Sequence, residues 1–253
     1  LSAVNSINWA RLMPQIVYYF TSALAVGAPD KPVAFSVPTG NFGNVFAGWV
    51  AMQMGLPVER FIVSSNRNDI LTRFFENGVM ERRDVHPSLS PSMDIQVSSN
   101  FERLLFELLG RDGKAVADAM QNFAEMGRFS VEDKVLQSAL QVFSGYCLDD
   151  TGTTAEIKRC FDMHNYLIDP HSAVGLAAAR NARAENLVDK DIPIISLACA
   201  HPAKFSDAVH HASGQMPALP AGLADLMSRE EQMLKVPNDM AAVQKLVLEH
   251  RRG

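Results

Sequence analysis

The chain has 253 residues, of which 47% are hydrophobic and 20% are charged. This composition is typical of a globular protein with one substantial core. The net charge is −5 and no basic run is longer than the pair Arg251-Arg252, which argues against nucleic acid as a partner. No apolar stretch approaches the ~20 residues that span a bilayer, so we expect no membrane segment. The three cysteines are too few, and odd in number, for a disulfide framework, and they predict a reducing, cytoplasmic setting.

The first third of the chain alternates between strand-like and helix-like segments. Residues 33–37 form a short apolar run that ends at a proline, which is typical of a buried strand. Residues 44–54 predict a helix, residues 60–64 a second strand, and residues 68–76 a further helix. Strands that alternate with helices favour an α/β fold, with a mostly parallel sheet flanked by helices.

The remaining two thirds are more helical in pattern. Residues 84–100 hold two prolines and five serines and predict a loop. Residues 101–143 predict mainly helix, with breaks at two glycines. Further helices are predicted over 151–166 and 171–184, an apolar strand over 192–199, and a helix that runs to about residue 212. The tail predicts amphipathic helices.

The run Pro38-Thr39-Gly40-Asn41-Phe42-Gly43-Asn44 connects a strand to a helix. Its two glycines let the backbone turn tightly and direct successive N–H groups to one spot. The start of the helix adds unsatisfied N–H groups with partial positive charge, and such a loop suits a phosphate dianion. The run matches neither the dinucleotide fingerprint nor the Walker pattern. A tight turn whose asparagine caps the helix is an equally open interpretation.

Four motifs resemble, in order, those of the threonine synthase family, which are fold-type II pyridoxal 5'-phosphate (PLP) enzymes of the tryptophan synthase β group. The motifs are Asn5-Ser6-Ile7-Asn8-Trp9-Ala10-Arg11 with Gln15 and Tyr18-Tyr19-Phe20 behind it, Ser36 to Asn44, Asp169-Pro170-His171-Ser172-Ala173-Val174-Gly175, and Ala200-His201-Pro202-Ala203-Lys204-Phe205. The resemblance implies that residues 1–253 are the larger, C-terminal, PLP-binding part of such an enzyme. Its core would span about 1–212, with a C-terminal helical extension over 213–253.

The family converts O-phospho-L-homoserine and water to L-threonine and phosphate, so the resemblance implies two phosphate sites. The cofactor phosphate would be held, mainly through backbone N–H groups, by Gly40, Asn41, Phe42, Gly43 and Asn44.

The substrate phosphate would be held by Asn5, Ser6 and Arg11. A planar guanidinium can bind a phosphate through two charge-assisted hydrogen bonds. The alternative is that Asn5 or Ser6 merely caps a helix while Arg11 lies on a solvated face.

Cys199 stands where the family usually has a threonine whose hydroxyl meets the pyridine nitrogen of PLP. A thiol is a weaker donor, but it is still a neutral partner for the ring. The alternative is that Cys199 is a small buried hydrophobic residue.

The family's Schiff-base lysine has no counterpart in this sequence, and Lys204 does not match its place. The resemblance puts that lysine in an N-terminal domain that would precede Leu1. The sequence begins at Leu1 without an initiator methionine. We therefore expect the rest of the same enzyme to be a partner of this chain, and we expect no turnover by the chain alone.

Two rival interpretations stay open. The first is another fold-type II enzyme, such as a threonine dehydratase or a cysteine synthase. The predicted binding of a substrate phosphate by the segment from Asn5-Ser6 to Arg11 argues against this interpretation. The second is a non-catalytic threonine-synthase-like protein that binds a phosphorylated ligand or a partner. No metal site is predicted, because Cys160 and His164 supply only two ligands on one helix face.

Overall fold

The computed structural model describes residues 5–198 and 200–250 of the chain. The chain forms two compact units, Leu1–Pro217 and Ala218–Gly253. The second unit holds the 3-10 helices η3 (Ala221–Leu223) and η4 (Leu226–Ser228) and the helix α10 (Met240–His250). None of its described residues is buried.

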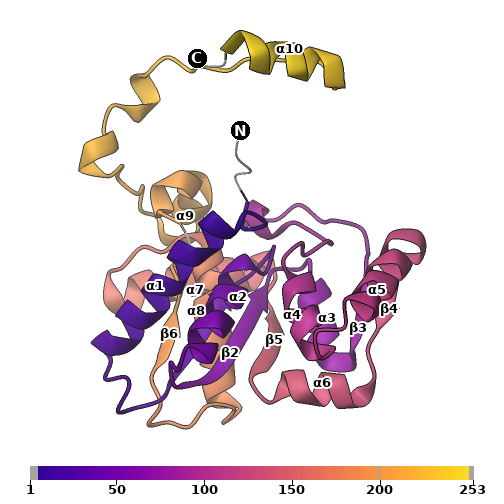
Figure 1. The fold of residues 1–253 in the computed structure, drawn as a ribbon. Helices are drawn as coiled ribbons and strands as arrows, with labels where there is room; N and C mark the ends of the chain where they lie inside the picture. The colour runs from indigo at the N-terminus through magenta and orange to yellow at the C-terminus, as the bar shows by residue number, and fades with distance from the viewer. Residues whose placement is uncertain (1–4, 199, 251–253) are drawn as a thin grey trace. The chain divides into compact units, whose positions relative to one another are not determined.

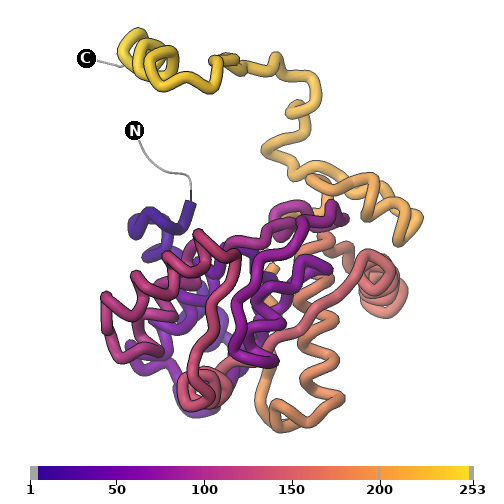
Figure 2. The backbone as a smooth tube through the Cα atoms, turned by 90° about the vertical axis from the view of Figure 1, so that its right-hand side faces the viewer, coloured from indigo at the N-terminus to yellow at the C-terminus, as the bar shows by residue number. Residues whose placement is uncertain are grey.

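The first unit alternates strands and helices (Figure 1), and its backbone can be followed in Figure 2. In chain order the elements are α1 (Trp9–Ala25), β1 (Val33–Pro38), α2 (Gly43–Gln53), β2 (Val58–Ser65), α3 (Ile70–Asn77), β3 (Val79–Glu81), the 3-10 helix η1 (Pro91–Met93), α4 (Phe101–Leu108), α5 (Gly113–Met126), β4 (Arg128–Ser130), α6 (Asp133–Leu140), β5 (Phe143–Cys147), α7 (Asp150–His164), α8 (Pro170–Ala184), β6 (Ile194–Ser196), the 3-10 helix η2 (Pro202–Phe205) and α9 (Ser206–Ser213).

Four strands form the main sheet in the order β5-β2-β1-β6, and every neighbouring pair is parallel. A separate two-stranded sheet pairs β3 with β4 in antiparallel fashion. The predicted α/β fold, with a mostly parallel sheet flanked by helices, is confirmed. From β1 the chain continues to β2 on one side, whereas β6 lies on the other. In open α/β sheets, ligands bind beyond the carboxyl ends of the strands at such a switch point.

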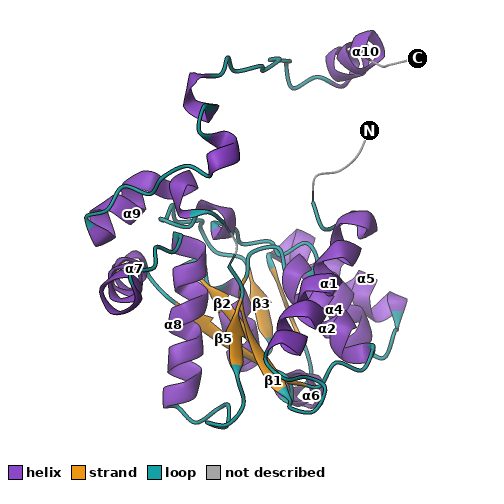
Figure 3. Ribbon diagram, turned by 90° about the vertical axis from the view of Figure 1, so that its left-hand side faces the viewer, coloured by secondary structure: helices purple, strands orange, loops and turns teal. Residues whose placement is uncertain are grey.

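Each face of the main sheet is covered by helices, as Figure 3 shows with α8 on one side and α1 and α2 on the other. The alternation of side chains along the strands explains why. Phe35 and Phe61 belong to the large core cluster that includes residues of α1, α2, α3 and α4. Ala34 and Ile62 point to the opposite face and pack with Ala178 of α8.

Local sequence signals begin and end several helices. Asp149 and Asp169 cap α7 and α8, because each carboxylate accepts a hydrogen bond from a backbone N–H of the first turn. Pro170 follows as the first residue of α8, where the missing N–H has no cost. Gly127 ends α5 in the left-handed conformation.

The structure differs from the predicted elements in several places. The segment 101–143, predicted as mainly helix, contains the strand β4 and the first residue of β5. The strand predicted over 192–199 is β6, which is limited to the residues that pair with β1. In the tail, α10 is the α-helix among the described residues, and the two other turns are short 3-10 helices.

Candidate functional site

The loop of residues 39–44 between β1 and α2, called here the β1–α2 loop, presents a row of unused backbone donors. Within residues 5–198 and 200–250, no atom accepts a hydrogen bond from the N–H of Gly40, Asn41, Phe42, Gly43 or Asn44. The N-terminus of α2 also has no side-chain cap. Free N–H groups at a helix start carry partial positive charge, so this loop can bind an anion.

The 98–100 segment holds the opposite side of this loop. The Ser98 hydroxyl donates to the carbonyl of Gly40 at 2.8 Å, and the side chain and backbone N–H of Asn100 both donate to the carbonyl of Asn41 at 3.0 Å. In a trans peptide, the carbonyl oxygen and the amide hydrogen point to opposite sides. Fixing these two carbonyls therefore turns the N–H groups of Asn41 and Phe42 away from the 98–100 segment.

Phe42 adopts a left-handed conformation with φ of 61°, which is uncommon for a bulky residue and strains the backbone. Packing holds it there, because its side chain is buried and its ring lies 5.2 Å from that of Phe101. The predicted contribution of Phe42 to the site thus comes from its backbone, while its side chain anchors the turn in the core.

Both glycines of the loop are close to other chain segments. A Cβ on Gly40 would lie 2.9 Å from the carbonyl oxygen of Ser92, and a Cβ on Gly43 would lie 2.4 Å from the Cβ of Ser6. Real Cβ atoms do not approach other atoms so closely, so a side chain at either position would displace its neighbour. The contact at Gly43 also brings the predicted substrate segment directly against the predicted cofactor loop.

Asn44 faces α1 with its side chain. Its Oδ1 lies 2.5 Å from the hydroxyl of Tyr18 and 2.9 Å from that of Tyr19, and both hydroxyls can donate to it. The backbone N–H of Asn44 stays available for an anion at the loop, because no described atom accepts a hydrogen bond from it.

Of the three residues predicted to bind substrate phosphate, Asn5 and Ser6 lie just before α1, and Arg11 lies in its first turn. Asn8, and not Asn5 or Ser6, caps α1 with its side chain. Ser6 accepts a hydrogen bond of 2.9 Å from Gln15. Arg11 is exposed, and its guanidinium makes no hydrogen bond or ion pair with the part of the chain that the structure describes.

A cavity of about 730 Å³ lies beside the β1–α2 loop. Residues from three of the four sequence motifs line it: Tyr18, Gly40, Asn44 and His171. Ala198 lines it as well, immediately before the fourth motif. Cys199, predicted as the ring partner, lies outside the described residues. The fold therefore gathers segments that are far apart in the sequence around one space beyond the carboxyl end of β1.

Comparison with known proteins identifies the family. Residues 172–247 match the model of the family described as "Threonine synthase, C-terminal". A threonine synthase from Pseudomonas aeruginosa is 53% identical over 251 residues, which cover 99% of this chain and 53% of the relative. The crystal structure of a PLP-bound threonine synthase from Brucella melitensis superposes with a TM-score of 0.93 at 50% identity, over 100% of this chain and 53% of the other. This chain belongs to the threonine synthase family.

A yeast threonine synthase structure agrees, with a TM-score of 0.89 at 38% identity over 98% of this chain and 53% of the other. The chain spans about half the length of these threonine synthases. The resemblance stated from the four motifs is confirmed at the level of family and fold.

His171 and Asp169, from the third threonine synthase motif, form a buried pair at the cavity. Nδ1 of His171 lies 2.9 Å from Oδ1 of Asp169, and Asp169 is fully buried. Burial by itself raises the pKa of Asp169, but hydrogen bonds from His171 and Ser172 outweigh it and hold the pKa below its ordinary value. Asp169 is therefore a carboxylate that orients the histidine ring.

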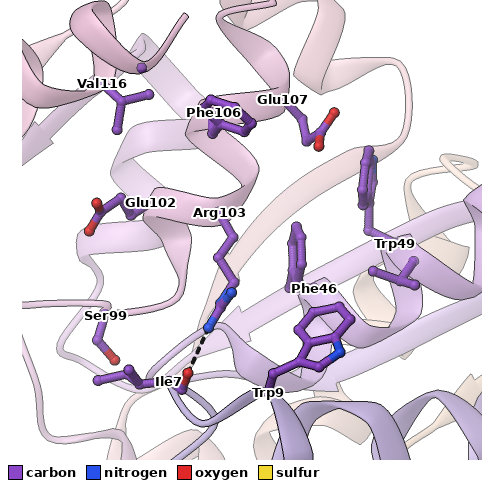
Figure 4. A pocket seen from close by; sticks show the side chains of 12 residues that line it. Ile7, Trp9, Phe46, Trp49, Ser99, Glu102, Arg103, Phe106, Glu107 and Val116 are labelled. Atoms are coloured by element: carbon purple, nitrogen blue, oxygen red, sulfur yellow. Dashed lines mark hydrogen bonds between the residues drawn. The ribbon is translucent and has the colours of Figure 1, made fainter. Parts of the chain in front are cut away.

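A second cavity of about 700 Å³ is lined by Ile7 and Trp9, which follow Ser6 in the chain. Figure 4 shows aromatic rings around it, with Arg103 in their midst and a hydrogen bond from Arg103 to the carbonyl of Ile7. The Arg103 guanidinium also lies 5.8 Å from the centre of the Trp9 ring. None of the N–H groups of the β1–α2 loop lines this cavity, so the first cavity is the better candidate for a phosphorylated ligand.

Sequence reasoning missed the residues that brace the loop: Ser92, Ser98, Ser99, Asn100 and Arg103. They lie in a segment that was predicted as a plain loop and at the start of the helix after it. The clustering of serines with an asparagine was the available signal, but its partners are 58 or 59 residues away in the chain. Within the described parts of the chain, no helix could span a membrane, and no group of three or more metal-ligating side chains occurs.

Proposed function

We propose that the protein carrying this chain is a threonine synthase that uses PLP to convert O-phospho-L-homoserine and water to L-threonine and phosphate. The observation that carries the proposal is the contact between Ser6 and Gly43. It joins a loop whose N–H donors have no acceptor among the described residues to the segment that leads into α1, where Arg11 is exposed. Two adjacent anion sites suit a phosphorylated cofactor and a phosphorylated substrate.

The residues present fit the phosphate of PLP. Gly40 and Gly43 let the loop turn while closely packed against Ser92 and Ser6, and the consecutive N–H groups of residues 40–44 lack acceptors among the described residues. In this proposal the backbone of residues 40–44 holds the cofactor phosphate, and the cavity of about 730 Å³ takes the ring. When bound, PLP supplies an electron sink for charge that develops on the substrate carbon atoms.

The chain's own part in the reaction is binding and orientation. Arg11 would grip the substrate phosphate with two charge-assisted hydrogen bonds, and the hydroxyl of Ser6 and the amide of Asn5 would add donors. Binding energy from the phosphate, which is remote from the carbon that receives water, can hold the substrate in a reactive geometry. Cys199 remains the proposed neutral partner of the cofactor ring.

The proton-transferring lysine would come from the part of the enzyme that precedes these motifs in the family. The protein would act in the cytoplasm, which the odd and small number of cysteines favours. The origin of the lysine rests on the family resemblance.

The test is an assay of the protein at its natural length, purified and supplied with PLP. Threonine and phosphate should form in equal amounts from O-phospho-L-homoserine, and Arg11→Ala should raise KM strongly. Absence of both products, with PLP bound, would sink the proposal. Release of ammonia from threonine or serine instead would favour the dehydratase interpretation.

A further inference from the structure

His171 stands between two partners that leave neither ring nitrogen free. Nδ1 faces Oδ1 of Asp169 at 2.9 Å, and Nε2 lies 3.3 Å from the backbone N of Ser92, whose N–H donates to it. The carboxylate is an acceptor, so Nδ1 carries the hydrogen, and the Ser92 amide is a donor, so Nε2 is the bare nitrogen. The ring is therefore neutral and in one tautomer.

The surroundings of His171 keep this arrangement rigid. The side chain is buried, and its ring lies 4.9 Å from that of Phe205 in η2. Asp169 is oriented in turn by the backbone N–H of His171 at 2.9 Å and by the hydroxyl of Ser172. A histidine whose two nitrogens are both engaged is poorly placed to exchange protons with a substrate, but it is well placed to hold a neighbouring segment.

The segment that His171 holds is the turn η1 over the β1–α2 loop. Ser92 receives the bond through its N–H, and its carbonyl oxygen is the atom 2.9 Å from the position of a Cβ on Gly40. Ser92, Gly40 and His171 all line the cavity of about 730 Å³. One residue thus connects the histidine to the point where the loop turns.

The residues on both sides of this turn are attached independently of His171. Nδ2 of Asn66, just after β2, donates to Oδ1 of Asp94 at 2.7 Å and to the hydroxyl of Ser90 at 3.0 Å. Loss of the contact with His171 would therefore leave the segment attached to the sheet, but would free the peptide of Ser92 to move.

We propose that His171 is a positioning residue, which holds the Ser92 peptide against Gly40 through a neutral ring nitrogen and so fixes the cavity wall at the β1–α2 loop. The inference deepens the proposed function, because it assigns the shape of the cofactor-phosphate site partly to a residue outside the loop. It implies that α8 is coupled to the loop through the Ser92 peptide, in addition to the packing of α8 against β1.

Two substitutions separate this role from a merely structural one. His171→Asn keeps a donor at the place of Nδ1 and loses the acceptor at the place of Nε2. His171→Gln keeps an acceptor at the place of Nε2 and loses the donor to Asp169. His164→Asn, at an exposed histidine near the end of α7, is the matched control.

Two measurements on the protein at its natural length test the proposal. Amide hydrogen exchange at Ser92 should be about 2- to 10-fold faster in His171→Asn, as expected for one net hydrogen bond, and the Kd for PLP should rise by a similar factor. His171→Gln and His164→Asn should stay within about twofold of the unsubstituted protein.

Equal behaviour of the Asn and Gln variants in either measurement would overturn the proposal, because the acceptor at Nε2 would then be irrelevant. Neither measurement needs turnover. A protein that forms no threonine, yet shows the expected difference between the two variants, would contradict the proposed reaction and support the role of His171.

Discussion

Substitution of Gly43 by alanine tests whether the loop and the substrate segment form one site. The added Cβ would lie 2.4 Å from the Cβ and 2.6 Å from the Oγ of Ser6, so one of the two residues must move. Gly43 is buried at the start of α2, whereas Ser6 is half-buried on a short segment before α1. We therefore expect Ser6 to be displaced while α2 stays in place.

The size of the effect follows from the overlap. Inserting a methyl group into a packed position costs about 1–3 kcal/mol, which at ~1.4 kcal/mol per factor of ten corresponds to about 5- to 150-fold. In Gly43→Ala this factor should appear in the KM for O-phospho-L-homoserine, measured by phosphate release. Gly113→Ala is the matched control, because Gly113 is also the first residue of a helix and has nothing within 4 Å of its Cβ position.

A double substitution makes the test sharper. With Ser6→Gly, the atom nearest to the new Cβ would be Nδ2 of Asn100 at 3.4 Å, which is close to ordinary contact. Gly43→Ala should then change KM by less than about twofold relative to Ser6→Gly alone, as expected for two residues that interact directly. The reasoning would be refuted if Gly43→Ala raised KM by the same factor with Ser6 and with Ser6→Gly. It would also be refuted if Gly43→Ala raised KM no more than Gly113→Ala does.

Three further predictions concern the other site residues. Arg11→Ala should raise KM by about 10- to 150-fold, the range for a charge-assisted hydrogen bond, and should leave the free energy of unfolding within about 0.5 kcal/mol because the side chain is exposed; an unchanged KM would exclude the grip. The pKa of Asp169 is held below its ordinary value, so the stability that its carboxylate adds is complete above about pH 4 and is lost as the pH falls further. Asp169→Asn should lower the free energy of unfolding at pH 7 by about 0.5–2 kcal/mol. The difference in this free energy between the variant and the unsubstituted protein should become smaller in acid. Urea titrations that give a constant difference in the free energy of unfolding down to pH 2 would contradict this. Cys199→Thr should alter the absorbance and affinity of bound PLP, and unchanged spectra, affinity and turnover would show that Cys199 is not the ring partner.

Elements with strong local signals were predicted well, and elements that depend on pairing were not. The strand β1 and the helices α2 and α8 have apolar runs and clear end signals, so their positions were predicted within a few residues. The strand β5 was missed because it is short, largely half-buried and follows a helical pattern. It is a strand because β2 offers it a parallel partner, and no local pattern encodes that partner.

The candidate site divides in the same way. The β1–α2 loop could be predicted from its glycines and its place between a strand and a helix, because tight turns and helix starts are local features. Two other contacts could not be predicted from the sequence. The side chain of Asn44 points to Tyr18, and the 98–100 segment donates hydrogen bonds to the loop carbonyls. These contacts join residues 26 to 59 positions apart in the chain.

The sequence by itself determined the parts: a glycine-containing loop before a helix, an arginine on α1, and an Asp-Pro-His start of α8. Their chemistry is local, because caps, turns and charges depend on a few neighbouring residues. Only the tertiary structure decided that Ser6 lies against Gly43 and that His171 holds Ser92 over Gly40. Parallel strands end at one edge of the sheet, so packing of the helices on both faces brings these distant segments to the same cavity.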